Sequence, residues 1–255
     1  MKKKSYKSTI FLVLEKMNFF LKIIPRRLIT SIRFISIFNR DFGHSRKKNG
    51  LCLDPNGLPI PWITYPCFEF LSRLDFSNST VFEFGSGSST LWWAKRARAV
   101  YSVERENDWY QTIRAQCPSN AKIELCKNEL KYAKNILTKN INFDVIVIDG
   151  AVRYPCVETA LKKIEINGII ILDNSEWYPN ACRLLREEGF VQIDFCGFSP
   201  INAFTSCTSL FFKNLAALSI FKSQLQWMPI GGKFLKAHDD VTIDKIVKET
   251  LFLAD

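Results

Sequence analysis

A glycine-rich run and two acidic residues have the types and spacing of a binding site. The run Val81–Thr90 reads VFEFGSGSST, so Gly85, Ser86 and Gly87 follow directly on an apolar, strand-forming segment. Glycines let a backbone approach a ligand closely. Glu104 ends the next apolar run, seventeen residues after Gly87, and a carboxylate at that place can accept both hydroxyls of a ribose. This combination predicts a site for a nucleotide-like ligand.

The residues around the glycine loop discriminate between two kinds of nucleotide-like ligand. A dinucleotide-binding loop has a third glycine, where this chain has Thr90, and it has no need for an acid before the first glycine. Glu83 occupies that place, and its carboxylate suits a ligand that carries an ammonium group. Glu83-Phe-Gly-Ser-Gly with Glu104 resembles motifs I and II of class I S-adenosylmethionine-dependent methyltransferases, and the resemblance covers residues 60–212.

This resemblance implies S-adenosylmethionine as the cofactor and assigns roles by position. The glycine loop would pass beneath the methionine part, Glu83 would orient its amino group, and Glu104 would hold the ribose. Asn128, which follows the third predicted strand, would lie near the adenine. The expected cofactor-binding residues are Glu83, Gly85, Ser86, Gly87, Glu104, Asn128 and Asp149.

Carboxylate and amide side chains end two further apolar runs. VIVID ends in Asp149, and IIILD ends in Asp173 with Asn174 directly after it. The carboxyl ends of parallel strands face one crevice, so these three side chains should converge. Their oxygens are of the kind that Mg²⁺ accepts, and DNSEW resembles the corresponding segment of cation-dependent O-methyltransferases. We therefore expect Asp149, Asp173 and Asn174 to be metal ligands, with Mg²⁺ as a second cofactor.

Two interpretations of Asp149 stay open. A bound metal would lower the pKa of an acceptor hydroxyl and present it to the sulfonium methyl. Without a metal, Asp149 would act as a base or position the acceptor. Arg153 is the nearest basic residue, so Asp149 and Arg153 are the expected catalytic residues. Aromatic residues that flank the predicted crevice and could contact the ligand are Trp62, Tyr65, Trp177 and Tyr178.

The segments that must position these residues alternate between strand and helix. Apolar runs of strand length occur at 80–84, 99–104, 122–126, 144–149, 168–173, 190–195 and 207–212. Helix-compatible segments separate the first six, which implies crossover connections and a mostly parallel sheet. No helix separates the last two, which should form an antiparallel pair at one edge. The predicted fold class is α/β, a Rossmann-like doubly wound sheet of seven strands, mostly parallel, with an antiparallel last strand.

Basic residues are concentrated at the N-terminal end of the 255-residue chain. Residues 1–48 contain 13 Lys and Arg against Glu15 and Asp41, a net charge of +11, whereas the other 207 residues carry −1. Apolar runs in this arm are too short for a signal peptide or a membrane-spanning helix. Its interleaved Phe and Ile suit an anionic membrane surface, and nucleic acid is the less favoured partner. A lid over the cofactor cleft is a third interpretation.

We expect four segments along the chain. They are a basic amphipathic arm at 1–48, a linker and N-terminal helix at 49–79, the S-adenosylmethionine-binding domain at 80–212, and a helical appendage at 213–255. The polar stretch 39–50 is typical of a linker, and a helix is expected at 241–253. The eight cysteines contain no CxxC pair and several lie in apolar runs, which predicts reduced, buried thiols and a cytoplasmic protein, with the arm at the inner face of the membrane.

These observations favour an S-adenosylmethionine-dependent methyltransferase that acts on an oxygen of a small-molecule, glycan or lipid-linked acceptor. One alternative is an NAD-dependent oxidoreductase, which Thr90 and Glu83 disfavour. The other is a non-catalytic protein, associated with a membrane or a nucleic acid, that keeps a vestigial fold. The basic arm supports this alternative, and the intact ligand residues argue against it.

Overall fold

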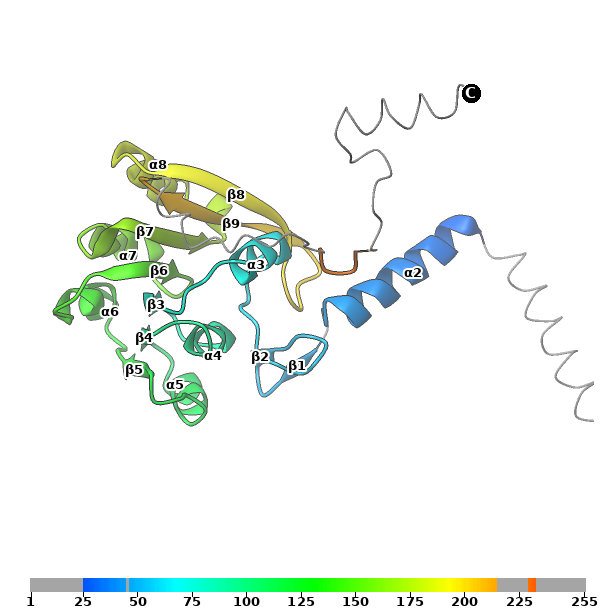
Figure 1. Ribbon diagram of the computed structural model, residues 1–255, viewed down its shortest axis with the longest axis horizontal. Coiled ribbons are helices and arrows are strands. Elements are labelled where there is room, and N and C mark those ends of the chain that lie inside the picture. Colours follow the sequence, from blue (N-terminus) through cyan, green and yellow to red (C-terminus); the bar gives the residue numbers. More distant parts are fainter. Residues whose placement is uncertain (1–24, 45, 215–228, 233–255) are drawn as a thin grey trace, which may run out of the picture. The chain divides into compact units, whose positions relative to one another are not determined.

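A computed structural model of the protein describes residues 25–44, 46–214 and 229–232. Its centre is a seven-stranded sheet with the order β5-β4-β3-β6-β7-β9-β8 (Figure 1). The strands are β3 (Thr80–Phe84), β4 (Ala99–Glu104), β5 (Ala121–Leu125), β6 (Phe143–Ile148), β7 (Ile164–Asp173), β8 (Val191–Phe198) and β9 (Thr205–Phe212). Six strands run in one direction, and β9 lies antiparallel between β7 and β8. The predicted fold class and its antiparallel last strand are confirmed.

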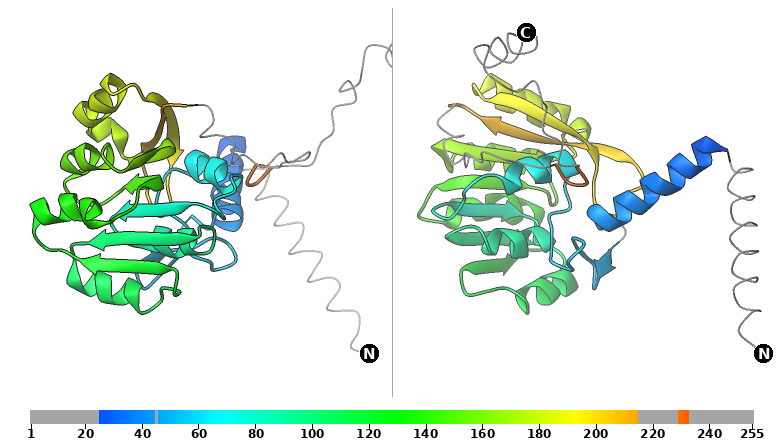
Figure 2. Two further views of the ribbon diagram at one scale, coloured as in Figure 1. Left: turned by 60° about the vertical axis from the view of Figure 1, so that its left-hand side comes forward. Right: turned by 45° about the vertical axis from the view of Figure 1, so that its right-hand side comes forward.

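Helices cover both faces of the sheet, which explains why its central strands are apolar almost throughout (Figure 2). The side chains of Val81 and Val147 point to one face, and those of Phe82 and Ile146 point to the other. The first face packs against α3 (Tyr65–Ser72) and α4 (Ser88–Ala94), with α5 (Asn107–Arg114) beside α4. The second packs against α6 (Glu129–Lys134), α7 (Arg153–Ala160) and α8 (Pro179–Glu187). Each side chain fully buried there contributes about 1.5–3 kcal/mol relative to exposure.

The register of the sheet brings the site-bearing strand ends together. Strands β3, β6 and β7 end in step, so Gly85, Asp149 and Asp173 lie side by side at one edge. The backbone N–H of Asp149 donates to the carbonyl of Phe84 at 3.1 Å, which extends the pairing past the last residue of β6. Parallel strands therefore place these side chains as predicted.

The segment 39–50 is not a linker, contrary to the prediction from its polarity. Helix α2 (Arg26–Asp41) extends into it, and β1 (Lys47–Lys48) pairs with β2 (Leu51–Cys52) in a short antiparallel hairpin. The backbone N–H of Cys52 donates to the hydroxyl of Ser88 at 2.9 Å, which fixes the hairpin to the first turn of α4. The expected boundary after residue 48 falls inside the turn of this hairpin.

Aromatic rings fix the end of α2 to the domain. The ring of Phe38 lies 5.6 Å from that of Tyr65 and 5.5 Å from that of Phe198. His44 packs on the same cluster, with its Nδ1 atom 3.2 Å from the Tyr65 hydroxyl. His44 is thus packed against the domain, and it does not reach the site described below. His238 lies outside the described residues.

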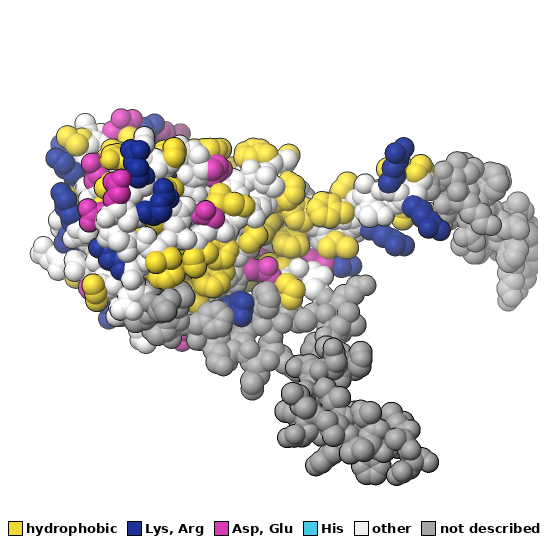
Figure 3. All heavy atoms as spheres, turned by 90° about the horizontal axis from the view of Figure 1, so that it is seen from above, with side chains coloured by type: hydrophobic (Ala, Val, Ile, Leu, Met, Phe, Trp, Pro, Cys, Tyr) yellow, Lys and Arg dark blue, Asp and Glu magenta, His cyan; other side chains and the backbone are white. Residues whose placement is uncertain are grey.

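Beyond this anchor, α2 exposes both apolar and basic side chains (Figure 3). The exposed apolar residues are Leu28, Ile32, Phe34, Ile35 and Ile37. Exposed arginines lie among them at positions 26, 27, 33 and 40. No helix in the described part of the chain is long and apolar enough to cross a membrane. Residues 1–24 of the arm and the helix expected at 241–253 lie outside the described residues.

The cysteines are only partly buried as predicted. All eight are free thiols, and five of them are buried. Cys117 and Cys126 are half-buried, and Cys196 is exposed. Cys196 stands on β8, where its side chain faces the solvent because β8 is the edge strand of the sheet. The prediction that Cys196 is buried is therefore wrong, because an apolar run on an edge strand does not ensure burial.

Candidate functional site

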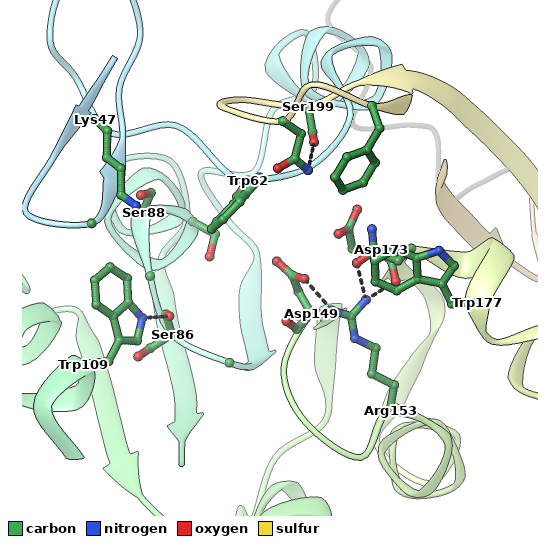
Figure 4. A pocket seen from close by; sticks show the side chains of 17 residues that line it. Lys47, Trp62, Ser86, Ser88, Trp109, Asp149, Arg153, Asp173, Trp177 and Ser199 are labelled. Carbon is green, nitrogen blue, oxygen red and sulfur yellow. Dashed lines mark hydrogen bonds and ion pairs between the residues drawn. The ribbon is translucent and has the colours of Figure 1, made fainter. Parts of the chain in front are cut away.

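A cavity of about 580 Å³ opens at the carboxyl ends of β3, β6 and β7 (Figure 4). Residues from the predicted site that line it are Gly85, Ser86, Gly87, Asp149, Arg153, Asp173 and Asn174. The other three, Glu83, Glu104 and Asn128, are not among its lining residues. The sheet thus joins the glycine loop and the polar strand ends in one space.

The glycine loop is shaped by a close contact between β3 and β6. Gly85 has a φ of 99°, and a Cβ atom on it would lie 2.9 Å from the Cα of Gly150. A Cβ on Gly150 would in turn lie 2.8 Å from the carbonyl oxygen of Phe84. Both positions therefore require glycine. At Gly87 a Cβ would make an ordinary contact with the ring of Trp109 at 3.7 Å, so no clash requires glycine there.

Trp109 supports the loop from α5, and the sequence analysis missed it. Its indole N–H donates to the carbonyl of Ser86 at 2.6 Å, and its ring lies against Gly87. Gly50, in the turn of the β1–β2 hairpin, contacts the same ring so closely that a Cβ would lie 2.6 Å from it. Lys47 of that hairpin also lines the cavity. The signal available in the sequence was a tryptophan in the helix that directly follows Glu104.

Glu104 lies behind the loop with its carboxylate fully engaged. Oε2 accepts hydrogen bonds from the backbone N–H and the hydroxyl of Ser86, each at 2.9 Å. Oε1 accepts from the backbone N–H groups of Arg105 at 2.7 Å and Glu106 at 3.0 Å. A carboxylate has about four acceptor positions, and these contacts use them. Glu104 therefore fixes the loop, and its contact with a ribose stays a prediction that requires the Ser86 hydroxyl to turn away.

Asn128 has a local structural role. Its side-chain oxygen accepts a hydrogen bond from the backbone N–H of Lys131 at 2.9 Å, so it caps the N-terminus of α6. It lies outside the cavity, and its contact with an adenine stays a prediction.

Glu83 is a buried carboxylate without a hydrogen-bond partner. It lies in the middle of the sheet on β3, and neither carboxylate oxygen meets a donor. Burial raises the pKa of Glu83 to about 7, although the nearby hydroxyls of Thr90 and Ser89 favour the charged form. A carboxylate kept dry and unpaired is costly, and a cationic ligand group nearby would offset that cost.

Arg153 forms the centre of the polar end of the cavity (Figure 4). Its guanidinium donates to the Asp149 carboxylate at 3.0 Å and to the Asn174 side-chain oxygen at 3.2 Å. Further bonds reach the backbone carbonyls of Asp149, Gly150 and Asp173. The side chain is buried against the ring of Tyr178 at 5.3 Å. One cation thus links the ends of β6 and β7.

The expected metal site does not fit this arrangement. Arg153 already bonds the side-chain oxygens of Asp149 and Asn174, which are two of the three predicted ligands. The third, Asp173, accepts the hydroxyl hydrogen of Thr208 at 2.6 Å. Within the described residues no group of three or more His, Cys, Asp or Glu side chains is arranged to hold a metal ion. A guanidinium takes the place that Mg²⁺ was expected to fill.

Burial of this acidic cluster raises the pKa of both aspartates. Burial first, and then the neighbouring charge of Asp173, hold the pKa of Asp149 well above its ordinary value, while Arg153 opposes the shift. The charge of Glu83 also raises the pKa of Asp149. Burial likewise raises the pKa of Asp173, against the hydrogen bond from Thr208. Arg153 thus opposes the pKa shifts of both aspartates.

Exposed aromatic rings also line the cavity, with Trp177 beside Asp173 and Trp62 across from it (Figure 4). Trp62, Trp177 and Phe204 line it with 42%, 60% and 53% of their surfaces exposed. Trp62 and Trp177 lie as the sequence predicts, whereas Tyr65 is buried. Asn202 donates to the hydroxyl of Ser199 at 2.8 Å, and both line the cavity. The β8–β9 loop that carries Ser199, Asn202 and Phe204 has no sequence motif and was not predicted.

The comparisons with known proteins reach only distant similarities. No protein-family model and no curated protein matches the chain. A precorrin-6y C5,15-methyltransferase of Geobacter metallireducens is 12% identical with a TM-score of 0.49, covering 68% of this chain and 96% of that chain. Spermidine synthase of Thermotoga maritima has 14% identity, a TM-score of 0.47 and coverages of 71% and 70%. A methyltransferase of Pyrococcus furiosus has 15% identity and a TM-score of 0.46, and the match covers 74% of this chain and 99% of that chain. Similarities at this level do not establish a family.

The raised pKa of Glu83 predicts how stability depends on pH. Between pH 4.5 and about 7 the folded protein holds a proton on Glu83 that the unfolded chain releases, so the free energy of unfolding falls as the pH rises. The contribution of this one group is about 3 kcal/mol across the window. Glu83→Gln should remove that part of the dependence, measured by urea unfolding from pH 4 to pH 8. The exposed Glu158→Gln is the control, and equal slopes in all three proteins would contradict the assignment.

Proposed function

We propose that this protein is an S-adenosylmethionine-dependent methyltransferase that transfers the methyl group to an oxygen of its acceptor. The observation that carries the proposal is the unpaired, buried carboxylate of Glu83 beneath a glycine loop, beside a cavity whose far end holds Asp149 and Asp173. Burial raises the pKa of all three acids, and Arg153 opposes the shift only for the two aspartates, so a cationic ligand group would be stabilised here. The motifs in the sequence resemble those of the same family.

The residues at the loop fit this cofactor. Glu83 would offset the charge of its ammonium group, and Gly87, which lines the cavity and has no side chain, would let its chain approach the backbone. Trp109 and Gly50 close that side of the cavity. When bound, S-adenosylmethionine supplies an electrophilic methyl group on a positively charged sulfur. A cavity with excess negative charge is suited to hold that sulfur.

Asp149 is the residue placed to take the acceptor proton. Its carboxylate is about one quarter exposed, and it lines the cavity. A base acts best when its pKa lies near the working pH, and burial moves the pKa of Asp149 upward from the ordinary aspartate value. Arg153 holds one oxygen of that carboxylate and leaves the other toward the cavity. The acceptor hydroxyl would lie between Asp149 and the aromatic side formed by Trp62 and Trp177.

Calorimetry with two adenosine ligands tests the cofactor assignment. The full chain should bind S-adenosylmethionine and should not bind NAD. Glu83→Gln should weaken S-adenosylmethionine binding by about 10- to 100-fold, because a charge-assisted contact is lost. Its affinity for 5′-methylthioadenosine, which lacks the ammonium group, should stay unchanged, and Glu158→Gln should match wild type. A folded wild-type protein that binds NAD, or neither ligand, refutes the proposal.

Kinetics with an acceptor found by radiolabelled methyl transfer test the role of Asp149. Asp149→Asn should lower kcat by about 10²- to 10⁴-fold, the usual contribution of a general base, with nearly unchanged cofactor affinity. Asp108→Asn, on the surface of α5, is the control. EDTA should leave the wild-type rate unchanged. Loss of activity in EDTA and its return with Mg²⁺ would instead restore the metal interpretation.

We also propose that α2 binds an anionic membrane surface. Its exposed isoleucines, leucine and phenylalanine lie among arginines, and each basic residue near such a surface contributes about 1 kcal/mol. The whole chain should float with anionic vesicles and less with neutral ones, and 1 M salt should weaken the binding. The Ile32→Glu, Ile35→Glu double variant should not float. Ile166→Glu, at an exposed position on β7, is the control. A double variant that floats as wild type does would contradict the proposal.

A further inference from the structure

Two cysteines face each other across the β8–β9 hairpin. Cys196 and Cys207 are direct partners in the antiparallel register, and their sulfur atoms lie 3.0 Å apart. Opposite residues of an antiparallel pair have Cα atoms about 4.5–5.5 Å apart and side chains on the same face. Disulfides span Cα separations of about 4.4–6.8 Å. This backbone can therefore accept a disulfide between the two strands without moving them apart.

The two thiols differ in their access to solvent. Cys196 is exposed on the edge strand, whereas Cys207 is buried and burial raises the pKa of its thiol to about 11. An oxidant in solution therefore meets Cys196 first, with Cys207 held against it. All eight cysteines lie in the described part of the chain. Cys67, whose pKa the charge of Cys207 affects, is fully buried.

We propose that Cys196 and Cys207 are a redox-responsive pair that a hydroperoxide converts into a disulfide. The Cys196 thiol loses its proton, its thiolate attacks the peroxide oxygen, and the O–O bond breaks. The released proton goes to the leaving oxygen, so the products are a sulfenic acid on Cys196 and water or an alcohol. The Cys207 sulfur then attacks the Cys196 sulfur, an S–S bond forms, and the sulfenic oxygen leaves as water. Two thiols are oxidised by two electrons in total, and one peroxide is reduced.

The pair lies at the base of the loop that lines the cavity. Ten residues separate Cys196 from Cys207, and among them Ser199, Asn202 and Phe204 line the cavity. The backbone N–H of Cys207 donates to the carboxylate of Glu176 at 3.0 Å, next to Trp177 on the facing side. A disulfide would therefore restrain the loop on the aromatic side of the cavity. Its effect on acceptor binding rests on the proposed function, whereas the disulfide itself does not.

Mass spectrometry of the full chain tests the pair directly. Trypsin leaves both cysteines in one peptide, residues 187–213, because no Lys or Arg lies between Arg186 and Lys213. After hydrogen peroxide, denaturation and alkylation, this peptide should be lighter by two hydrogens and carry no alkyl group, and dithiothreitol should reverse the change. Chymotrypsin, which can cleave after Phe198 and Phe204, should yield two linked fragments. Neither cofactor nor acceptor is needed, so this result is independent of the proposed function.

Matched variants and a second readout complete the test. Cys117→Ser should form the disulfide as wild type does, and Cys196→Ser should not. Oxidation of the wild type should raise the thermal midpoint and slow backbone hydrogen exchange across residues 199–204, and Cys196→Ser should show neither change. Three results would overturn the proposal. They are two alkylated cysteines after peroxide, a link between Cys67 and Cys207, and over-oxidation of Cys196 without a disulfide. Unchanged hydrogen exchange in the disulfide form would overturn the restraint on the loop.

Discussion

The guanidinium of Arg153 is the contact on which the polar end of the site depends. It bonds backbone carbonyls that follow β6 and end β7, and it pairs with the Asp149 carboxylate. Removing one partner of a buried, hydrogen-bonded charge pair costs about 3–5 kcal/mol. The same side chain sets the direction of Asp149 and fills the place of a metal ion. Arg153 thus supplies the positive charge that joins the ends of β6 and β7.

The buried acids set the electrostatics of the cavity, which Lys47 and Arg153 also line. Glu83, Asp149 and Asp173 all have a raised pKa, since burial penalises their charged forms, and Arg153 compensates only partly for the two aspartates. A ligand with a sulfonium and an ammonium group would relieve this penalty, because opposite charges lower the pKa of a carboxyl group. The raised pKa values of these acids and the proposed preference for a cationic cofactor would thus have one physical cause.

Much of the fold was predictable from the sequence, and the site only in part. Alternating apolar runs fixed the strands, and parallel topology then required Asp149 and Asp173 to converge. The role of Arg153 was partly hidden, because a charged residue near a strand end gives no sign that it will be buried. Trp109 and the β1–β2 hairpin reach the site through contacts between segments distant in sequence, for which no local pattern exists. Only the folded chain shows such contacts.

The central claim is that the cavity uses its excess of buried acids to bind a cationic cofactor. Calorimetry of S-adenosylmethionine binding at pH 7, repeated in buffers with different ionisation enthalpies, measures the protons released on binding. The account predicts binding with release of up to about 0.5 proton, because Glu83, with a pKa of about 7 without ligand, is half protonated at pH 7 and its pKa would fall beside an ammonium group. Binding whose heat does not depend on the buffer, or no binding by the folded protein, would contradict it.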